Sequence, residues 1–165
     1  MKKETDIFKV YQETIEKLEG DGILLVAGDP PNPMTIGWGT IGIIWHMQIF
    51  TVYVRPIRYT FHLMENSKDF TVNVLSGEYK KQLNFCGTKS GRDLDKIEKC
   101  GLTLEKSFKV STPHILESHI HYECRVVHRH RIDPGMLDQR IIRRYYPLKD
   151  FHMVYYGEVM GIYKK

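Results

Sequence analysis

The sequence predicts a mainly β fold, an antiparallel barrel with helices on its periphery. Short apolar or alternating runs recur along the chain between turn residues, as expected of many strands of similar length. Few stretches show helical periodicity, and helices do not alternate regularly with strands, which argues against a doubly wound sheet. The 165 residues contain no repeat, low-complexity tract or linker, so a single domain over residues 1–165 is expected.

The first third of the chain is expected to hold one helix followed by three strands. Apolar residues recur at spacings of three and four over residues 6–19, which predicts an amphipathic helix. The wholly apolar run 23–27 predicts a buried strand. A loop rich in proline at 28–33 precedes two further strands, at about 34–44 and 48–55.

The middle of the chain predicts two helices around a strand. Pro56 ends the preceding strand and suits the first position of a helix over about 57–66. Alternating apolar residues over 70–74 predict a half-buried strand. Apolar residues at helical spacing between 79 and 86 predict the second helix.

The remainder predicts two long strands and two helices. Ser90 and Asp93 have the spacing of a capping-box pair, so a helix is expected to begin after Ser90. Residues 115–132 alternate between apolar and polar side chains, as a strand does. A short helix at about 137–145 precedes a final strand over 151–163, in which two glycines mark bulges or bends.

Composition excludes several classes of protein. Hydrophobic residues make up 42% and charged residues 27%, which excludes global disorder. Three scattered cysteines without a CxxC pair exclude a disulfide scaffold and a zinc finger. The start lacks the apolar segment of a signal peptide. The uncharged stretch 36–54 is rich in glycine and β-branched residues, which favours two strands over a membrane helix. A cytoplasmic protein with no membrane partner is therefore expected.

Positive charge is concentrated in one segment. Residues 125–144 hold six arginines against two aspartates, which accounts for the formal net charge of +4. One hypothesis is a barrel that binds nucleic acid through this segment. The segment lacks paired aromatic residues for stacking on bases, so a solvated strand edge and helix face are favoured. No nucleic-acid partner is expected.

Two segments contain groups suited to a ligand. Residues 87–92 (GTKSGR) offer two glycines, two hydroxyls, a lysine and backbone N–H groups before the expected helix, which suits a phosphate. Residues 32–39 (NPMTIGWG) place glycines beside a strand, where a flat ligand could approach the backbone. The alternatives are an ordinary capped loop and a core strand that uses glycine for curvature. Arg55, at a strand end, suits a phosphate or carboxylate, and equally a surface acid.

Other reactive residues carry weaker signals. His119 and His121 share one strand face, as do His128 and His130, and such pairs can chelate a metal. No spacing signature supplies the remaining ligands, so no metal site is expected. No cysteine has an activating context, and no nucleophile elbow is present.

Several stretches resemble the flavin reductase-like family, which has the FMN-binding split-barrel fold, and especially its flavoredoxin-like members. The matching stretches occur in the expected order: NPMTIGWG at 32–39, FTVYVRPIRYT at 50–60, ENSKDFTVNV at 65–74, CGTKSGRDLDK at 86–96 and DFHMVYYGEV at 150–159. Each is weak alone, but the ordered set covers nearly the whole chain.

The resemblance implies a non-covalent FMN at a homodimer interface. It places the ribityl chain and ring along Asn32, Met34, Thr35, Ile36, Gly37 and Trp38, and the pyrimidine edge along the backbone of residues 51–54, including Val54. It places the phosphate among Arg55, Thr60, Lys89, Ser90 and Gly91. His152 would lie close to the ring as the catalytic residue, with His128 a weaker candidate.

The resemblance also implies a redox function. The expected activity is that of an NAD(P)H-dependent flavin reductase or oxidoreductase, which passes electrons from FMN to a small-molecule or protein acceptor. The alternative is a flavoredoxin-like electron-transfer protein, reduced by a protein partner and without its own site for NADH or NADPH. The turn at residues 46–48 lacks the glycine–lysine–proline type associated with close relatives, and this departure bears on nicotinamide access.

Overall fold

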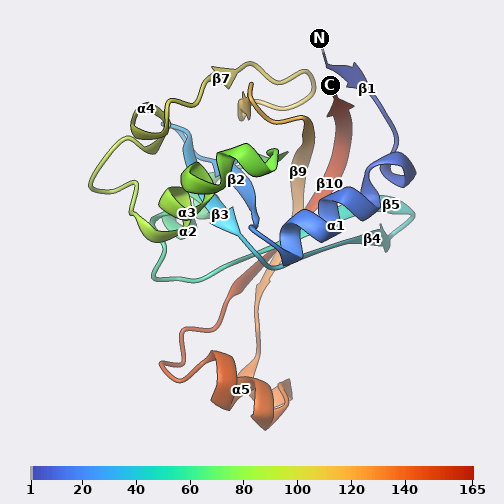
Figure 1. Cartoon of the computed structure of the whole chain (residues 1–165). Helices are drawn as coiled ribbons and strands as arrows, with labels where there is room; N and C mark the ends of the chain where they lie inside the picture. Colours follow the sequence, from blue (N-terminus) through green and yellow to red (C-terminus); the bar gives the residue numbers. More distant parts are fainter. Residues whose placement is uncertain (1) are drawn as a thin grey trace.

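The computed structural model describes residues 2–165 as a curved sheet with helices around it (Figure 1). The strands are β1 Lys3–Glu4, β2 Ile23–Ala27, β3 Asn32–Ile36, β4 Gly39–Ile44, β5 Met47–Val54, β6 Asp69–Val74, β7 Leu104–Glu105, β8 His114–Ile115, β9 Ile120–Arg131 and β10 Met153–Lys164. The helices are α1 Tyr11–Glu19, α2 Tyr59–Asn66, α3 Lys80–Thr88, α4 Lys96–Cys100 and α5 Gln139–Tyr145, with 3-10 turns η1 Ile7–Lys9, η2 Gly77–Tyr79 and η3 Pro134–Met136.

The main sheet is antiparallel and runs in the order β3-β2-β6-β9-β10-β5-β4, with β1 added at β10. Its two edge strands, β3 and β4, follow each other in sequence through Gly37 and Trp38. They pair with different neighbours, β3 with β2 and β4 with β5. The sheet therefore curls until its edges meet at this two-residue connection, and within residues 2–165 it does not close. The mainly β prediction is confirmed.

The interior of the barrel holds the larger of two apolar clusters. It contains Phe50, Phe70, Tyr122 and Tyr155, all fully buried. Helix α1 lies against it, and the hydroxyls of Thr14 and Tyr122 are 2.7 Å apart, so the buried polar groups are paired.

The run 23–27 is wholly apolar because β2 is buried on both faces. Leu25 packs into the barrel cluster, whereas Leu24 and Val26 pack outward against Leu83 and Cys86 of α3. Burial on both faces removes the need for alternation, as the continuous apolar run predicts.

The long strands β9 and β10 curve around the barrel and require glycine at one point. Their register shifts between Tyr156 and Gly157, and again between Val159 and Gly161. A Cβ on Gly157 would lie 2.4 Å from Cζ of Phe70. Only glycine lets the strand pass that close to the buried ring, so the predicted role of these glycines in bulges is confirmed.

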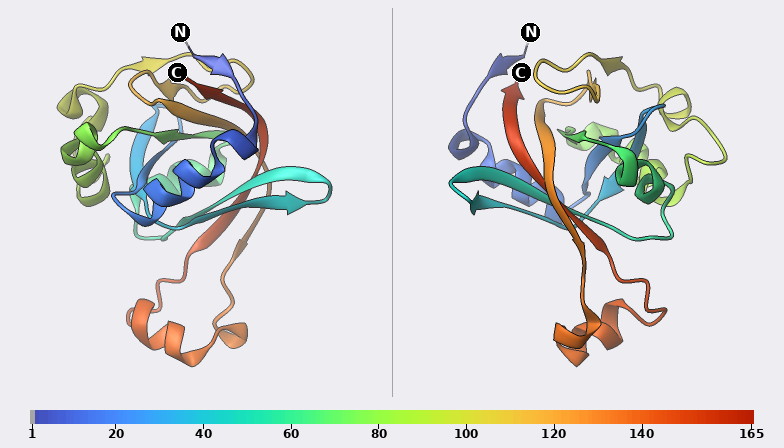
Figure 2. Two further views of the ribbon diagram at one scale, coloured as in Figure 1. Left: turned by 45° about the vertical axis from the view of Figure 1, so that its right-hand side comes forward. Right: turned by 180° about the vertical axis from the view of Figure 1, so that it is seen from behind.

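Beyond the barrel, β9 and β10 continue as a protruding arm that carries η3 and α5 (Figures 1 and 2). The outer half of β9 is largely exposed, as are most residues of α5. Met136 and Leu148 expose 87% and 81% of their surface. The arginine-rich segment 125–144 thus lies on a projecting feature with little packing of its own.

The strand predicted over 70–74 is buried on both faces and is not half-buried. Thr71 and Asn73 on its polar face are fully buried, and Thr71 Oγ1 donates to the Pro113 carbonyl while Asn73 Oδ1 accepts from Ile115 N–H. The strand predicted over 115–132 begins at Ile120, and the helix predicted over 6–19 is the turn η1 followed by α1.

Three further predicted elements differ from the structure. The strand expected over 34–44 is two strands, because the chain passes from one edge of the sheet to the other at Gly37. Pro56 is not the first residue of α2, because a turn closed by Arg58 N–H and Arg55 C=O intervenes. The helix expected after Ser90 begins at Lys96.

That last difference has a clear physical cause. The Asp95 carboxylate accepts hydrogen bonds from the N–H groups of Ile97 and Glu98, and so caps α4. The Ser90 hydroxyl instead accepts from Arg92 N–H and stabilises a turn. Ser90 and Asp93 do not form the predicted capping box.

No helix in the described residues is both long and apolar enough to span a bilayer.

Candidate functional site

A cleft opens where the two edges of the sheet meet. Its wall combines the end of β3 and the β3–β4 connection with the ends of β5 and β10. The lining residues are Met34, Thr35, Ile36, Gly37, Trp38, Tyr53, Arg55, Arg58 and His152, around a space of about 200 Å³. The structure therefore brings together residues that are more than a hundred positions apart in the sequence.

A second hollow, of about 180 Å³, adjoins the first. It is lined by Ile57, Arg58, Tyr59, Thr60, Thr88, Lys89, Ser90, Gly91 and Lys96. Arg58 lines both spaces, so they form one elongated site with two ends. Of the thirteen predicted site residues, eleven line one of these two hollows, and Asn32 lies behind the second hollow.

The second hollow gathers groups that are suited to an anion. Arg58 is the N-cap residue of α2 and makes no side-chain capping bond, so the helix presents free N–H groups beside Tyr59 and Thr60. Lys89 and Lys96 add two ammonium groups from the other wall. Burial lowers the pKa of Lys96 to about 8, and its Nζ donates to the Cys86 carbonyl at 3.0 Å.

The helix that serves this hollow is not the one predicted. Lys89, Ser90 and Gly91 follow the C-terminus of α3 and precede a turn, not a helix. The N-terminus at this end of the site belongs to α2, whose first turn faces the same space. The prediction of an anion-binding loop at the start of the following helix is therefore corrected.

Gly91, Asn32 and Thr60 fit together behind this hollow. Asn32 Nδ2 donates to Thr60 Oγ1 at 2.9 Å, and both side chains are buried. A Cβ on Gly91 would lie 1.8 Å from Asn32 Oδ1. Glycine is therefore required for the loop to approach the start of β3, and Asn32 supports the site from behind.

The first hollow is aromatic and positively charged. The rings of Trp38 and His152 have centroids 4.8 Å apart, and the Arg55 guanidinium lies 5.9 Å from the centre of the Trp38 ring. The Tyr146 hydroxyl lies 2.8 Å from His152 Nδ1. Burial, and then the charge of Arg55, lower the pKa of His152 to about 4, so this imidazole is neutral at pH 7.

Arg55 lies at a different end of the site from the one expected. Its Nη1 is 2.7 Å from Asp150 Oδ2, and its Nη2 donates to the Tyr145 carbonyl at 2.9 Å. It does not line the hollow that contains Lys89. Arg58, three positions later, lies where the predicted anion partner was expected.

Val54 is the predicted site residue whose side chain does not reach the cleft. It is fully buried in the barrel core and is paired with Met153 in the ladder between β5 and β10. The prediction for this position concerned its backbone, and the side chain serves packing.

Sequence reasoning missed Arg58, Lys96 and Tyr53. Arg58 had a usable signal, because a second arginine follows Pro56 immediately before a helix. Lys96 had none, because its position depends on how α4 packs against α3. Tyr53 lies on a strand whose alternation gives no indication of which face meets the cleft.

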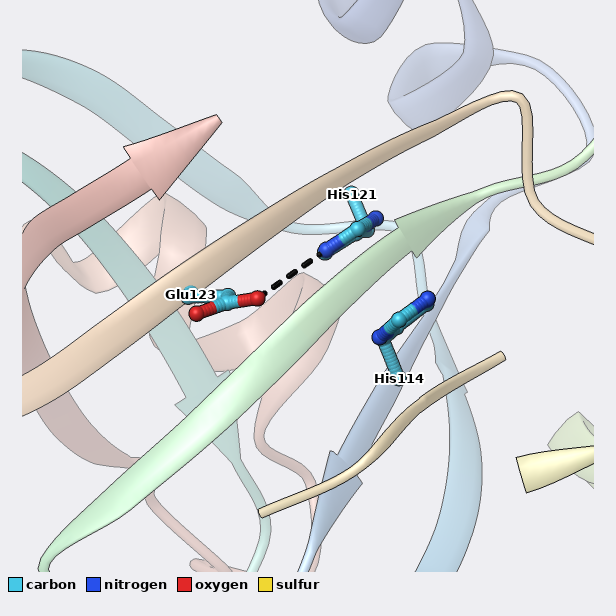
Figure 3. A group of neighbouring side chains, drawn as sticks. All are labelled: His114, His121 and Glu123. Carbon is cyan, nitrogen blue, oxygen red and sulfur yellow. Dashed lines mark hydrogen bonds and ion pairs between the residues drawn. The ribbon is translucent and has the colours of Figure 1, made fainter. Parts of the chain in front are cut away.

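A separate histidine cluster lies at β8 and β9 (Figure 3). His114, His121 and Glu123 are buried, and each has a potential ligand atom within 4.8 Å of the others. The two rings are stacked with centroids 3.8 Å apart and planes inclined by only 5°. A metal bonds imidazole nitrogen in the plane of its ring, and nearly parallel planes at this spacing share no such point. The arrangement is that of a stacked polar network.

Carboxylates hold this network in place. His114 Nε2 is 3.0 Å from Glu105 Oε2, and His121 Nε2 is 3.1 Å from Glu123 Oε1. Glu123 also accepts from the N–H groups of Phe108 and Lys109. The cluster therefore anchors the loop between β7 and β8. His121 does not pair with His119, which contacts Glu13.

Sequence comparisons place the chain among known proteins. Residues 20–164 match the family model described as a flavin reductase like domain. An uncharacterised protein of Archaeoglobus fulgidus is 38% identical over 105 residues, which are 63% of this chain and 59% of that protein. The chain thus spans less than two thirds of that relative.

Two solved structures share the fold. Flavoredoxin of Desulfovibrio vulgaris (Miyazaki F) has a TM-score of 0.68 and 21% identity, covering 87% of this chain and 69% of its own. An FMN-binding domain of a flavin reductases-like enzyme from Shewanella baltica OS155 has a TM-score of 0.70 and 17% identity, covering 99% and 77%. The open sheet is thus a split barrel. With the family model matching residues 20–164, this chain belongs to the flavin reductase-like family.

Proposed function

We propose that the chain binds one FMN without a covalent bond and acts as a flavoprotein oxidoreductase. The observation that carries the proposal is the elongated site, which has an aromatic end at Trp38 and a cationic end at Lys89, with Arg58 lining both. FMN has corresponding parts, because a planar ring and a phosphate lie at opposite ends of a ribityl chain. The donor set thus fits the cofactor named in the solved structures of similar fold.

The cationic end suits the phosphate. The N-terminus of α2, Arg58 and Lys89 supply N–H donors and positive charge, and Ser90 adds a hydroxyl. Arg58 is half-buried, and its desolvation strengthens the attraction for a dianion relative to an exposed arginine. Thr60 and Gly91 complete the end wall.

The aromatic end suits the ring. Gly37 leaves the backbone at the sheet edge uncovered, and Met34, Ile36 and Trp38 supply an apolar wall. Once bound, FMN supplies the electron chemistry, and the protein positions it.

His152 is the residue we assign to the chemistry at this end. It is neutral at pH 7, and in the tautomer protonated at Nε2 the Tyr146 hydroxyl donates to Nδ1. Its Nε2–H then remains as a donor at the wall of the cleft. His152 thus holds a proton beside the ring without adding a charge.

Two sources of electrons are compatible with this site. In the first proposal, NADH or NADPH delivers hydride to the bound cofactor, which then passes electrons to a small-molecule or protein acceptor. In the second, a partner protein reduces the cofactor, which the likeness to flavoredoxin favours. Stopped-flow mixing with NADH and NADPH separates them, because rapid bleaching of the visible band excludes the second.

We also propose that the protein works as a homodimer. The arm of β9, β10 and α5 projects from the barrel and exposes Met136, Ile141 and Leu148. A second copy would cover these apolar groups, in line with the family's dimeric arrangement. Sedimentation equilibrium tests this, and a monomer at micromolar concentration would contradict it.

The visible absorption spectrum of the purified protein tests the central proposal. We expect the protein to show an oxidised-flavin spectrum as purified, or to keep such a spectrum through desalting after FMN has been added. Riboflavin, which lacks the phosphate, should be retained less well than FMN. A protein that stays colourless after loading would leave the family relationship intact but contradict FMN binding.

A further inference from the structure

Two thiols from different helices are in contact beside the site but outside its lining. Cys86 Sγ on α3 lies 3.8 Å from Cys100 Sγ at the end of α4. The third cysteine, Cys124, lies in the barrel cluster, whereas Cys86 and Cys100 belong to the cluster outside β2. We propose that Cys86 and Cys100 form a modification site, an intramolecular disulfide made by exchange with a small disulfide, which pins the segment between them.

The segment between the two cysteines is the wall of the anion-binding hollow. It carries Lys89, Ser90, Gly91 and Lys96. Between α3 and α4 it runs through turns, and α4 has only five residues. A covalent link from residue 86 to residue 100 would close this segment into a ring and reduce the number of conformations it explores.

One hydrogen bond already joins the two helices. Lys96 Nζ, at the start of α4, donates to the carbonyl of Cys86 on α3 at 3.0 Å. Apolar packing of Leu83 and Ile97 in the same cluster adds to it. The sulfur atoms are thus in van der Waals contact in the reduced form. A displacement of about 2 Å toward each other would bring them to the length of a disulfide bond.

Differences in exposure set the order of the exchange steps. Cys100 is partly exposed, whereas Cys86 is fully buried. Burial raises the pKa of Cys86 to about 12 and also raises the pKa of Cys100, so both are thiols at neutral pH and react slowly. Because Cys100 alone of the pair is partly exposed, a small disulfide reaches Cys100 first.

The chemistry balances without a further oxidant. The Cys100 thiol loses its proton, and the thiolate attacks one sulfur of the small disulfide. The sulfur–sulfur bond of the small disulfide breaks, a mixed disulfide forms on Cys100, and the released thiolate takes up a proton to give one thiol. The Cys86 thiolate then attacks Sγ of Cys100 and releases the second thiol. The two cysteines lose two electrons and two protons in total, and the small disulfide is reduced to two thiols.

Mass spectrometry of the full chain tests the covalent step and needs no bound cofactor. Reduced protein is incubated with oxidised glutathione, quenched with acid, alkylated and digested. We expect peptides joined through Cys86 and Cys100 that lack two hydrogen atoms, a transient glutathione adduct on Cys100, and free Cys124. A lasting adduct on Cys100 with Cys86 free, or three unmodified cysteines, would overturn the proposal.

Two variants and hydrogen exchange test the consequence. Oxidation should slow amide exchange over residues 88–95 several-fold in the wild type and in Cys124→Ala, which retains the pair. Cys100→Ser, at a partly exposed position, should show no slowing and no linked peptide. A wild-type protein that contains the disulfide but shows unchanged amide exchange over residues 88–95 would overturn the proposal that the disulfide restrains this segment.

Discussion

Arg55 Nη1 lies 2.7 Å from Asp150 Oδ2, and this pair spans the end of β5 and the segment that leads into β10. The Asp150 carboxylate holds the guanidinium beside Trp38 and Tyr146, at 5.9 and 5.2 Å from the two ring centres. The pair therefore places a fixed positive charge next to His152 at the aromatic end of the site.

This arrangement predicts opposite effects of two substitutions on the pKa of His152. Arg55→Met removes a cation that disfavours the imidazolium, so the pKa should rise from about 4. Asp150→Asn removes the anion that favours the imidazolium, so the pKa should fall. NMR titration of the histidine ring protons measures both changes. Shifts of the same sign in the two variants would contradict the assignment.

Arg58→Ala should weaken FMN binding by about tenfold, because one partly desolvated charged hydrogen bond is lost. Riboflavin affinity should change much less, because the loss concerns the phosphate. Arg92→Ala is the matched control, since Arg92 lies over the Tyr59 ring at 5.9 Å but does not line the hollow. Fluorescence titration with FMN and with riboflavin compares both variants with the wild type. Equal losses of affinity for FMN and riboflavin would contradict the assignment of the phosphate to this end of the site.

Gly91→Ala should damage the site and the fold together. Its Cβ would lie 1.8 Å from Asn32 Oδ1, so Asn32 must move and release Thr60. We expect a loss of about 1–3 kcal/mol in the free energy of unfolding, with weaker FMN binding. Gly42→Ala is the control, because nothing lies within 4 Å of the added carbon. Urea denaturation compares the two, and similar stabilities would contradict the predicted clash.

His114 should make the protein less stable as the pH falls below neutrality. Burial, and then the nearby His121, lower the pKa of His114 to about 3 in the folded protein. In the unfolded chain this group takes up a proton near pH 6.5. Between these values the unfolded state binds more protons, so the free energy of unfolding falls by about 1.4 kcal/mol per pH unit for this group.

Denaturation between pH 4 and 7 in wild type and His114→Gln measures this contribution. The free energy of unfolding should depend less steeply on pH in the variant, by the amount expected for the uptake of about one proton. His121 and His152, whose pKa values are also lowered, should retain the remainder of the slope. Comparing slopes separates the titration from any uniform loss of stability caused by the substitution, and equal slopes would contradict it.

Local chemistry determined much of this fold. The apolar run of β2, the alternation in β6 and β9, and the glycines of β10 each specify an element from neighbouring residues alone. Such patterns are readable because burial on one or both faces has a fixed period along a strand. The mainly β class follows from them, and the ordered motifs identify the family and the residues around the cleft.

Capping was harder to predict from sequence. Ser90 and Asp95 are both good N-cap residues, and each is followed three positions later by an acidic residue, Asp93 and Glu98. The structure uses Asp95, because α4 must begin where Lys96 can reach the Cys86 carbonyl and Ile97 can pack outside β2. The choice between two local signals was made by packing between α3 and α4.

The amino-acid sequence alone indicates most of the long strands, and the residues that are chemically suited to a phosphate and a flat ring. Tertiary packing places Arg58 at the wall of both hollows and turns Arg55 to Asp150, which no local pattern indicates. It also places the first turn of α2, and not the helix after Ser90, at the cationic end of the site. The physical reason is that charge and donor type belong to a residue, whereas the space they share is created by distant segments packing together.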